Sequence, residues 1–217
     1  MLRGIVFDMD GVVIDSHPVH RRAWKTFLQT VGREVTDAEL DFILDGRKRD
    51  EILCYFLGDL TPSQIADHGA HKDEMLRQLA EDMHPFPGVV EFLDSLAHVG
   101  MRIALATSAG SRRAHGTLRE LGLARYFEAI VTGDEVTSGK PDPAIYRLAA
   151  KRLHEIPENL LAIEDAVSGV KSAKSAGMHC LGIACADRAE ALRAAGADPV
   201  IADFQSLSLE KLEAKFR

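Results

Sequence analysis

Cysteine is scarce in this chain of 217 residues, which contains only Cys54, Cys180 and Cys185. An odd number of cysteines, with no Cys-x-x-Cys spacing, argues against a disulfide framework and against a zinc or redox site. Each of the three lies in an apolar stretch of sequence. We therefore predict reduced thiols buried in the core.

Long hydrophobic runs and an excess of basic residues are also missing. No apolar segment approaches the roughly 18 residues that a membrane-spanning helix requires. The segment after Met1 leads directly into a predicted strand rather than into the hydrophobic region of a signal peptide. The formal net charge is −7, whereas proteins that bind nucleic-acid backbones usually carry a basic face. We expect a cytoplasmic protein that binds neither membranes nor nucleic acid.

From residue 84 onward the chain alternates short apolar runs with amphipathic segments. This pattern is typical of βαβ units, in which helices cover both faces of a parallel sheet. Glycines stand where three of the predicted helices should end and a left-handed residue is often needed, at Gly100, Gly122 and Gly177. The sequence therefore predicts a doubly wound, Rossmann-like α/β core. Its strands are expected at 2–7, 102–106, 129–132, 160–163 and 179–183, and its helices at 89–99, 112–121, 143–153, 169–176 and 189–195.

Residues 15–83 differ because they contain no clear strand. Apolar residues recur there at helical spacing, as in the segment 24–31. The segment 84–88 that follows contains two prolines and a glycine, which suits a hinge. We predict an all-helical cap domain at 15–83, inserted into a core domain formed by 1–14 and 84–217.

Two carboxylates, Asp8 and Asp10, stand where the first predicted strand ends, and Gly11 follows them. Two acids this close repel each other in their charged forms, which favours a bound divalent cation or a proton held on one of them. The spacing also arises by chance in a chain with many aspartates, so a solvated acidic turn is the alternative. The surroundings of the pair must decide between the two.

Two other predicted strands also end in reactive residue types. The strand at 102–106 is followed by Thr107 and Ser108, and the strand at 160–163 by Glu164 and Asp165. The carboxyl ends of the strands in a doubly wound sheet share one crevice. These side chains should therefore converge with the two aspartates of the first strand.

The converging residue types suit phosphoryl transfer. Asp8 is the predicted nucleophile, which would form an aspartyl-phosphate, and Asp10 the general acid and base, kept protonated by the neighbouring acids. The hydroxyls of Thr107 and Ser108 and the amine of Lys140 would bind the phosphate. Hard oxygen ligands suit Mg²⁺ as the cofactor. The predicted metal ligands are Asp8, Asp10, Glu164 and Asp165, and whether Glu164 binds the metal directly stays open.

At these positions the chain resembles the haloacid dehalogenase superfamily. Its four motifs are matched in order by the segment 8–12, Thr107-Ser108, Lys140-Pro141 and Glu164-Asp165. The resemblance covers essentially the whole chain, and the second aspartate implies the phosphotransferase branch. The helical insertion is similar to the cap of the β-phosphoglucomutase-like and sugar-phosphatase group.

This resemblance implies roles for three cap residues. His20 matches a histidine that lies near the general acid, and Arg49 matches an arginine that holds a substrate phosphate. Lys72 is a weaker match to another cap lysine. All three are predicted to line the substrate site.

Other polar residues of the cap are given no catalytic role. Arg47 and Lys48 are interpreted as a solvated helix face. His68 and His71 have a spacing that a metal could use on a helix, but no third ligand stands near them. We predict that these two histidines are exposed.

The segment after Ser108 bears on the reaction. β-Phosphoglucomutases usually carry serine, lysine and asparagine-type residues there, whereas this chain has Ala109, and only Arg112 or Arg113 could compensate by charge. We expect a monomeric phosphatase acting on a small phosphorylated metabolite, such as a sugar phosphate, with a phosphosugar mutase as the alternative. A non-catalytic phospho-accepting or phosphosugar-sensing domain is the remote third reading, because both aspartates are intact.

Overall fold

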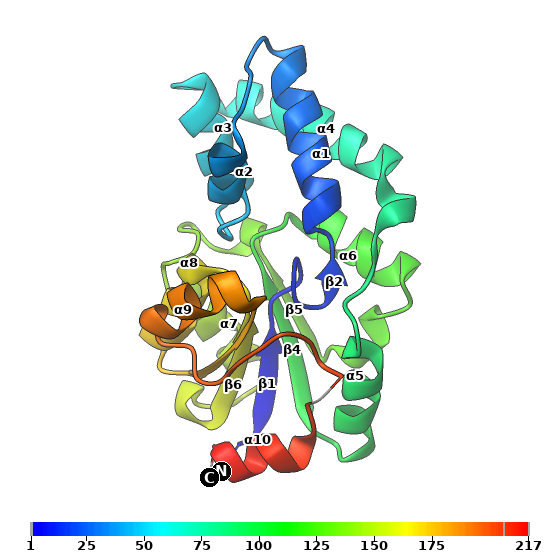
Figure 1. Ribbon diagram of the computed structural model, residues 1–217, viewed down its shortest axis with the longest axis vertical. Helices are drawn as coiled ribbons and strands as arrows, with labels where there is room; N and C mark the ends of the chain where they lie inside the picture. The colour runs from blue at the N-terminus through cyan, green and yellow to red at the C-terminus, as the bar shows by residue number, and fades with distance from the viewer. Residues whose placement is uncertain (1, 206, 217) are drawn as a thin grey trace.

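The computed structural model describes residues 2–205 and 207–216, and a parallel sheet forms its centre (Figure 1). The six strands lie in the order β5-β4-β1-β6-β7-β8, and every neighbouring pair is parallel. The predicted doubly wound α/β core is therefore confirmed. The strands are β1 (Gly4–Phe7), β4 (Arg102–Thr107), β5 (Ala129–Thr132), β6 (Leu160–Glu164), β7 (His179–Ile183) and β8 (Val200–Ile201).

Helices cover both faces of this sheet because the side chains of each strand alternate between two apolar clusters. In β1, Ile5 and Phe7 belong to the cluster under α5, α6 and α10, whereas Val6 belongs to the cluster under α7, α8 and α9. Gly100, Gly122 and Gly177 have positive φ angles, as predicted from their places after helices. The core helices are α5 (Val89–His98), α6 (Ser111–Glu120), α7 (Ala144–Arg152), α8 (Val167–Ala176), α9 (Ala186–Ala195) and α10 (Leu209–Lys215).

The register of the central strands places their carboxyl ends side by side. Phe7 pairs with Leu105 of β4 and with Ile163 of β6. The backbone N–H of Asp8 then donates to the carbonyl of Ile163 at 3.0 Å. The first residues after β1 and the last residue of β6 consequently meet at one edge of the sheet.

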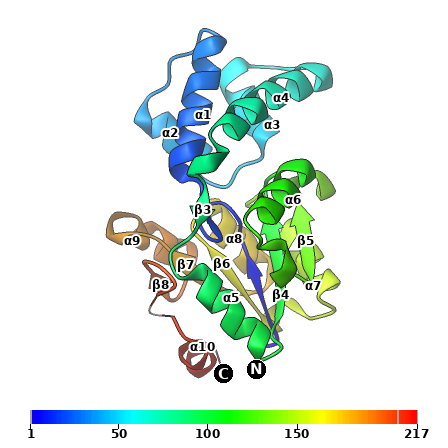
Figure 2. The ribbon, with the colours of Figure 1, turned by 90° about the vertical axis from the view of Figure 1, so that its right-hand side faces the viewer.

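The chain leaves the core through β2 (Ile14–Asp15) and returns through β3 (His84–Pro85), and these two short strands pair antiparallel. The helices between them have an apolar cluster of their own, which includes Trp24, Phe27 and Leu53. They lie beyond the carboxyl ends of the sheet (Figures 1 and 2). The inserted cap is helical as predicted, and its boundaries at 15 and 83 stay a prediction. Its helices are α1 (His17–Thr30), α2 (Asp37–Ile43), α3 (Arg49–Leu57) and α4 (Pro62–Gln78), followed by the 3₁₀ turn η1 (Ala80–Asp82).

The prediction for the cysteines was correct only in part. Cys180 is buried in β7, but Cys54 and Cys185 are exposed. Cys54 follows the buried Leu53 on α3 and faces solvent, and Cys185 stands at the cap position before α9. Within the described ranges no helix combines the length and apolar character needed to cross a membrane.

Candidate active site

A cavity of about 160 Å³ lies where the carboxyl ends of the strands face the cap. Both the core and the cap supply its walls, so residues far apart in sequence meet there. Lys140 lies behind this wall, where its Nζ reaches Asp8. The predicted site residues that line the cavity are Asp8, Asp10, His20, Arg49, Lys72, Thr107, Ser108, Glu164 and Asp165.

Lys140 is the buried cation of the site. Its Nζ lies 2.5 Å from Asp8 Oδ1 and 2.5 Å from Glu164 Oε1, and it also donates to the carbonyl of Ala106 at 3.2 Å. Burial alone would lower the pKa of Lys140, but the charges of Asp8 and Glu164 raise it above its usual value. Burial raises the pKa of Asp8 well above its usual value, and the neighbouring acids add to this against the opposing charge of Lys140.

Tyr146 completes this buried network and was not predicted from the sequence. Its hydroxyl donates to Glu164 Oε1 at 2.6 Å, so Glu164 accepts from both Tyr146 and Lys140. A tyrosine on the amphipathic helix α7 has the pattern of a core residue, and Tyr146 indeed packs in the core. Only its short sequence distance from Lys140 could have indicated that Tyr146 also takes part in the hydrogen-bond network of the site.

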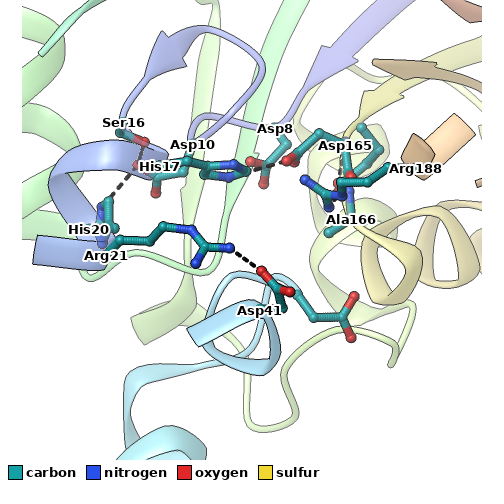
Figure 3. Close-up of polar contacts among 12 residues, drawn as sticks. Asp8, Asp10, Ser16, His17, His20, Arg21, Asp41, Asp165, Ala166 and Arg188 are labelled. Atoms are coloured by element: carbon teal, nitrogen blue, oxygen red, sulfur yellow. Dashed lines mark hydrogen bonds and ion pairs between the residues drawn. The ribbon is translucent and has the colours of Figure 1, made fainter. Parts of the chain in front are cut away.

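Three carboxylates form the group that fits a metal ion. Within residues 2–205 and 207–216, oxygens of Asp8, Glu164 and Asp165 lie within 4.8 Å of one another, and no other group of this kind occurs. Asp165 Oδ2 is buried and accepts no hydrogen bond from the described residues, although His17 Nε2 lies 3.2 Å away (Figure 3). A buried carboxylate oxygen that accepts no hydrogen bond, beside two further carboxylates, fits a hard divalent cation such as Mg²⁺. The carboxylate of Asp10 lies outside this group, so its role as a metal ligand stays a prediction.

Asp10 is held from the cap and from α6. Arg113 binds both of its oxygens, at 2.5 Å and 3.0 Å, and the hydroxyl of Ser16 donates to Oδ1 at 2.7 Å. Burial would raise the pKa of Asp10, but the charge of Arg113 and the contact with His20 outweigh it and hold the pKa well below its usual value. The prediction that neighbouring acids keep Asp10 protonated was therefore wrong, because the nearest charge to this carboxylate is a guanidinium.

His20 and Lys72 extend this arrangement into the cap. His20 Nε2 lies 3.3 Å from Asp10 Oδ1, and Lys72 Nζ lies 3.4 Å from His20 Nδ1. Burial lowers the pKa of Lys72 to about 7, with the charge of Arg113 acting in the same direction. Burial and the charge of Lys72 lower the pKa of His20 to about 3. His20 is consequently a neutral imidazole at neutral pH.

The two hydroxyl groups predicted to bind phosphate have different partners. Thr107 Oγ1 accepts from the backbone N–H of Ala109 at 3.1 Å. Ser108 Oγ donates to the carbonyl of Gly46 at 2.6 Å and so joins the core to the cap. Both residues line the cavity, and their role as phosphate ligands stays a prediction.

The basic segment before α3 is less exposed than predicted. Arg49 lines the cavity and pairs with Asp73 at 2.7 Å. Lys48 is half-buried and donates to the carbonyl of Val136 at 3.0 Å, and the guanidinium of Arg47 lies 4.4 Å from the centre of the Phe42 ring. The interpretation of Arg47 and Lys48 as a solvated helix face was wrong, because both precede the helix and contact other parts of the chain.

The two cap histidines at helical spacing both lie against Phe27, with ring centres 5.8 Å and 5.7 Å away. His71 is exposed as predicted, and His68 is half-buried. Neither belongs to the group of metal-ligating residues found in the described part of the chain.

Comparisons with known proteins show which proteins this chain resembles. The phosphorylated carbohydrates phosphatase of Thermotoga maritima is 35% identical over 180 residues, which cover 82% of this chain and 83% of that protein. The beta-phosphoglucomutase of Bacillus subtilis is 32% identical over 224 residues, which cover 99% of this chain and 96% of that protein.

A solved structure is also similar over nearly its whole length. The crystal structure of CbbY from Rhodobacter sphaeroides in complex with phosphate has a TM-score of 0.84 and 30% identity, covering 98% of this chain and 100% of that chain. Residues 2–177 match the family model described as haloacid dehalogenase-like hydrolase. Family and fold therefore agree, and this chain is an enzyme that belongs to the haloacid dehalogenase-like hydrolases.

Proposed function

We propose that the enzyme is a Mg²⁺-dependent phosphatase that hydrolyses a phosphorylated sugar, or a similar small phosphomonoester, through an aspartyl-phosphate on Asp8. The observation that carries this proposal is the placement of Asp8. Its carboxylate lies at the cavity between a buried lysine and two further acids, and Asp10, two residues along, lines the same cavity. One carboxylate is thus available as a nucleophile and the other for proton transfer.

In the first step, an oxygen of Asp8 attacks the phosphorus, a new P–O bond forms, and the bond to the sugar oxygen breaks. Asp10, in its protonated form, gives its proton to the leaving alkoxide. Lys140 neutralises charge on the Asp8 carboxylate and on the transferring group. The products are a free alcohol and phosphorylated Asp8.

In the second step, a water molecule attacks the phosphorus of phosphorylated Asp8. Asp10, now a carboxylate, accepts a proton from this water, and the acyl-phosphate bond breaks to release inorganic phosphate. Arg113 and Ser16 keep the Asp10 carboxylate aimed at the cavity. The low pKa of Asp10 keeps it in the ionised form that the base step needs, although it also weakens Asp10 as a base. Proton donation in the first step requires Arg113 to loosen its contact.

The carboxylates of Asp8, Glu164 and Asp165 would hold Mg²⁺, which supplies positive charge to the phosphate oxygens when bound. The buried oxygen of Asp165 that accepts no hydrogen bond supports this assignment, since burying a carboxylate oxygen without a hydrogen bond is costly. Lys140 and Tyr146 fix the orientation of Glu164.

A phosphosugar mutase is the second candidate. A mutase must bind a second phosphate while the sugar turns over, and Ala109 has no side-chain donor for this purpose. Arg49 and Arg113 line the same cavity and are the observation in favour of such a site. Each of them is already paired with a carboxylate, Arg49 with Asp73 and Arg113 with Asp10, so we place the phosphatase first.

A turnover screen of phosphorylated sugars with Mg²⁺ tests the proposal. Inorganic phosphate release and isomer formation are followed together, with β-glucose 1-phosphate and a trace of the 1,6-bisphosphate among the substrates. Phosphate release without isomer is expected. Isomer formation that outruns phosphate release would establish the mutase instead.

Two variants connect the screen to Asp8. Asp8→Asn should reduce turnover by about a thousandfold or more and should abolish an acid-stable, hydroxylamine-sensitive phosphoenzyme. Asp187→Asn, which changes an exposed aspartate of α9, is the matched control and should behave like the wild type. Full activity of Asp8→Asn would contradict the proposed nucleophile.

A further inference from the structure

A second cavity, with a volume of about 700 Å³, lies beside the catalytic one between α4 of the cap and α6 of the core. Figure 2 shows these two helices facing each other across the boundary between cap and core. The two cavities are adjacent parts of one cleft, because they share five lining residues. These are Arg49, Asp73, Gly110, Arg113 and Asp134.

The sizes of the two cavities indicate how a substrate is divided between them. Sites for small-molecule ligands usually enclose about 300–1,000 Å³. The catalytic cavity, at about 160 Å³, is too small for a complete sugar phosphate, whereas the α4–α6 cavity, at about 700 Å³, falls within that range. A phosphate bound at Asp8 would therefore leave most of its alcohol portion in the α4–α6 cavity.

Small residues on both walls create this space. Gly116 stands inside α6, where glycine costs a helix about 1 kcal/mol relative to alanine. No packing requirement explains it, because a Cβ built at Gly116 would meet no atom within 4 Å. Ala66 and Ala70 line the same cavity from α4. The missing side chains leave room for a ligand rather than for a close helix contact.

The polar groups of the α4–α6 cavity suit hydroxyl groups better than a second phosphate. Arginine and carboxylate side chains line it in nearly equal number, and two pairs are already made, Arg49 with Asp73 and Arg77 with Glu74. Such walls offer both donors and acceptors without a strong field of one sign. Ala66 and Ala70 are exposed on the α4 wall and provide apolar surface for the C–H face of a sugar ring.

We propose that the α4–α6 cavity binds the leaving group of the substrate, and that this leaving group is a neutral, hydroxylated unit larger than one sugar ring. The substrate class is then a phosphate monoester of disaccharide size. This inference rests on the proposed function, because it requires the phosphate of that ester to be placed at Asp8.

Turnover of a size series tests the inference. The wild-type enzyme with Mg²⁺ is given p-nitrophenyl phosphate, monosaccharide phosphates, sugar bisphosphates and a panel of disaccharide phosphates such as trehalose 6-phosphate and sucrose 6-phosphate. At least one disaccharide phosphate is expected to exceed its monosaccharide counterpart in kcat/KM by about tenfold or more. Preference for a monosaccharide phosphate or for a bisphosphate would overturn the inference.

Two substitutions fill the cavity from opposite walls, Gly116→Phe on α6 and Ala70→Phe on α4. Each should lower the ratio of kcat/KM for the preferred disaccharide phosphate to that for p-nitrophenyl phosphate by about tenfold. His115→Phe is the control, because it places the same phenyl ring, here in exchange for an imidazole, at the neighbouring, exposed position of α6, which lines neither cavity. Its ratio should equal that of the wild type.

The p-nitrophenyl phosphate arm separates this inference from the proposed function. Turnover of that ester without any size preference, and with kcat/KM ratios unchanged in both cavity-filling variants, would refute the α4–α6 binding site. The proposed phosphatase activity would still hold. Absence of turnover with every phosphate ester would refute both.

Discussion

At the scale of single residues, Arg113 sets the charge of the proposed acid and base. It contacts both oxygens of Asp10 and comes from α6, more than a hundred positions later in the chain. The guanidinium therefore favours the carboxylate form of Asp10 and resists the protonated form. Activity as a function of pH should depend on this one contact.

Replacing Arg113 with alanine should raise the pKa of Asp10 to and beyond the usual value of about 3.9, because burial raises this pKa once the guanidinium no longer opposes it. The acidic limb of the kcat profile for p-nitrophenyl phosphate should then move to higher pH, because the carboxylate needed as a base is protonated earlier as the pH falls. The profile is measured from about pH 4 to about pH 8. Arg125→Ala is the control, because it removes a solvent-exposed guanidinium from the surface of the core domain. An acidic limb that does not move would contradict the assignment.

Lys72 should make stability depend on pH, since burial lowers its pKa to about 7 in the folded protein. Between that value and the unfolded value near 10.4, the unfolded chain binds the proton and the folded chain does not, so this group makes stability rise with pH. Lys72→Met should therefore stabilise the protein most at and below about pH 7, and the gain should shrink toward about pH 10. Urea unfolding across this pH range measures the gain in the free energy of unfolding.

Lys151→Met changes an exposed lysine and is the control, and its free energy of unfolding should change little at any pH. A gain for Lys72→Met that is the same at every pH would refute the pKa shift.

The residues of the site that could be predicted are those at strand ends. Asp8 and Asp165 follow apolar runs that the sequence makes obvious, and the parallel topology then brings them together. Tyr146 and the pairing of Arg113 with Asp10 could not be predicted in the same way. Both depend on how a helix packs on the sheet, and helical periodicity gives a face but not its partner.

At the scale of elements, α6 contains a glycine in its middle, Gly116, and α8 contains one in its first turn, Gly169, and the two have different structural reasons. A Cβ at Gly169 of α8 would lie 2.0 Å from Glu164 Oε1. Glu164 is held by Lys140 and Tyr146 and cannot move away without breaking the buried network. Gly169 is thus required for close approach of helix and strand, whereas Gly116 has open space.

Gly169→Ala should therefore destabilise the protein although alanine favours a helix. The overlap with Glu164 should cost up to roughly 3 kcal/mol, which exceeds the gain in helix propensity of at most about 1 kcal/mol. Gly116→Ala is the matched comparison and should raise the free energy of unfolding by up to about 1 kcal/mol. Urea unfolding of both variants measures whether each substitution raises or lowers the free energy of unfolding. Equal changes in the two variants would show that helix propensity alone determines the effect.

The elements missed from the sequence are short or peripheral. β2, β3 and β8 have two residues each, too few for an alternating pattern to be recognised. The longer strands and helices carry buried residues at regular spacing, so their periodicity could be read, with boundaries shifted by up to three residues. The C-terminal helix α10 was not predicted, although Leu212 packs in the main core cluster.

For the whole molecule, the cluster of three carboxylates should make the free energy of unfolding depend on metal binding. Without a cation, burial and neighbouring acids raise the pKa values of Asp8 and Asp165. The folded state then keeps protons that the unfolded chain has released, so above the usual pKa of about 3.9 these two groups make stability fall as pH rises. Mg²⁺ binds the ionised carboxylates and should oppose this loss.

The difference in Tm between samples with Mg²⁺ and samples with a chelator should consequently be larger at about pH 8 than at about pH 5. Differential scanning calorimetry measures both series. Asp165→Asn should remove most of the difference, and Asp203→Asn, which changes an aspartate outside the metal group, should preserve it. A difference that is independent of pH would contradict the proposed ligands.

The lone tryptophan of the chain lies at a useful place. Trp24 is buried in α1, forms part of the catalytic cavity wall and has Lys72 Nζ 5.2 Å from its ring centre. Its indole contacts the same ammonium group that touches His20, and no second indole exists to mask its emission. The protein thus carries a built-in fluorophore, and we expect its fluorescence to change with the charge and occupancy of the site without any added label.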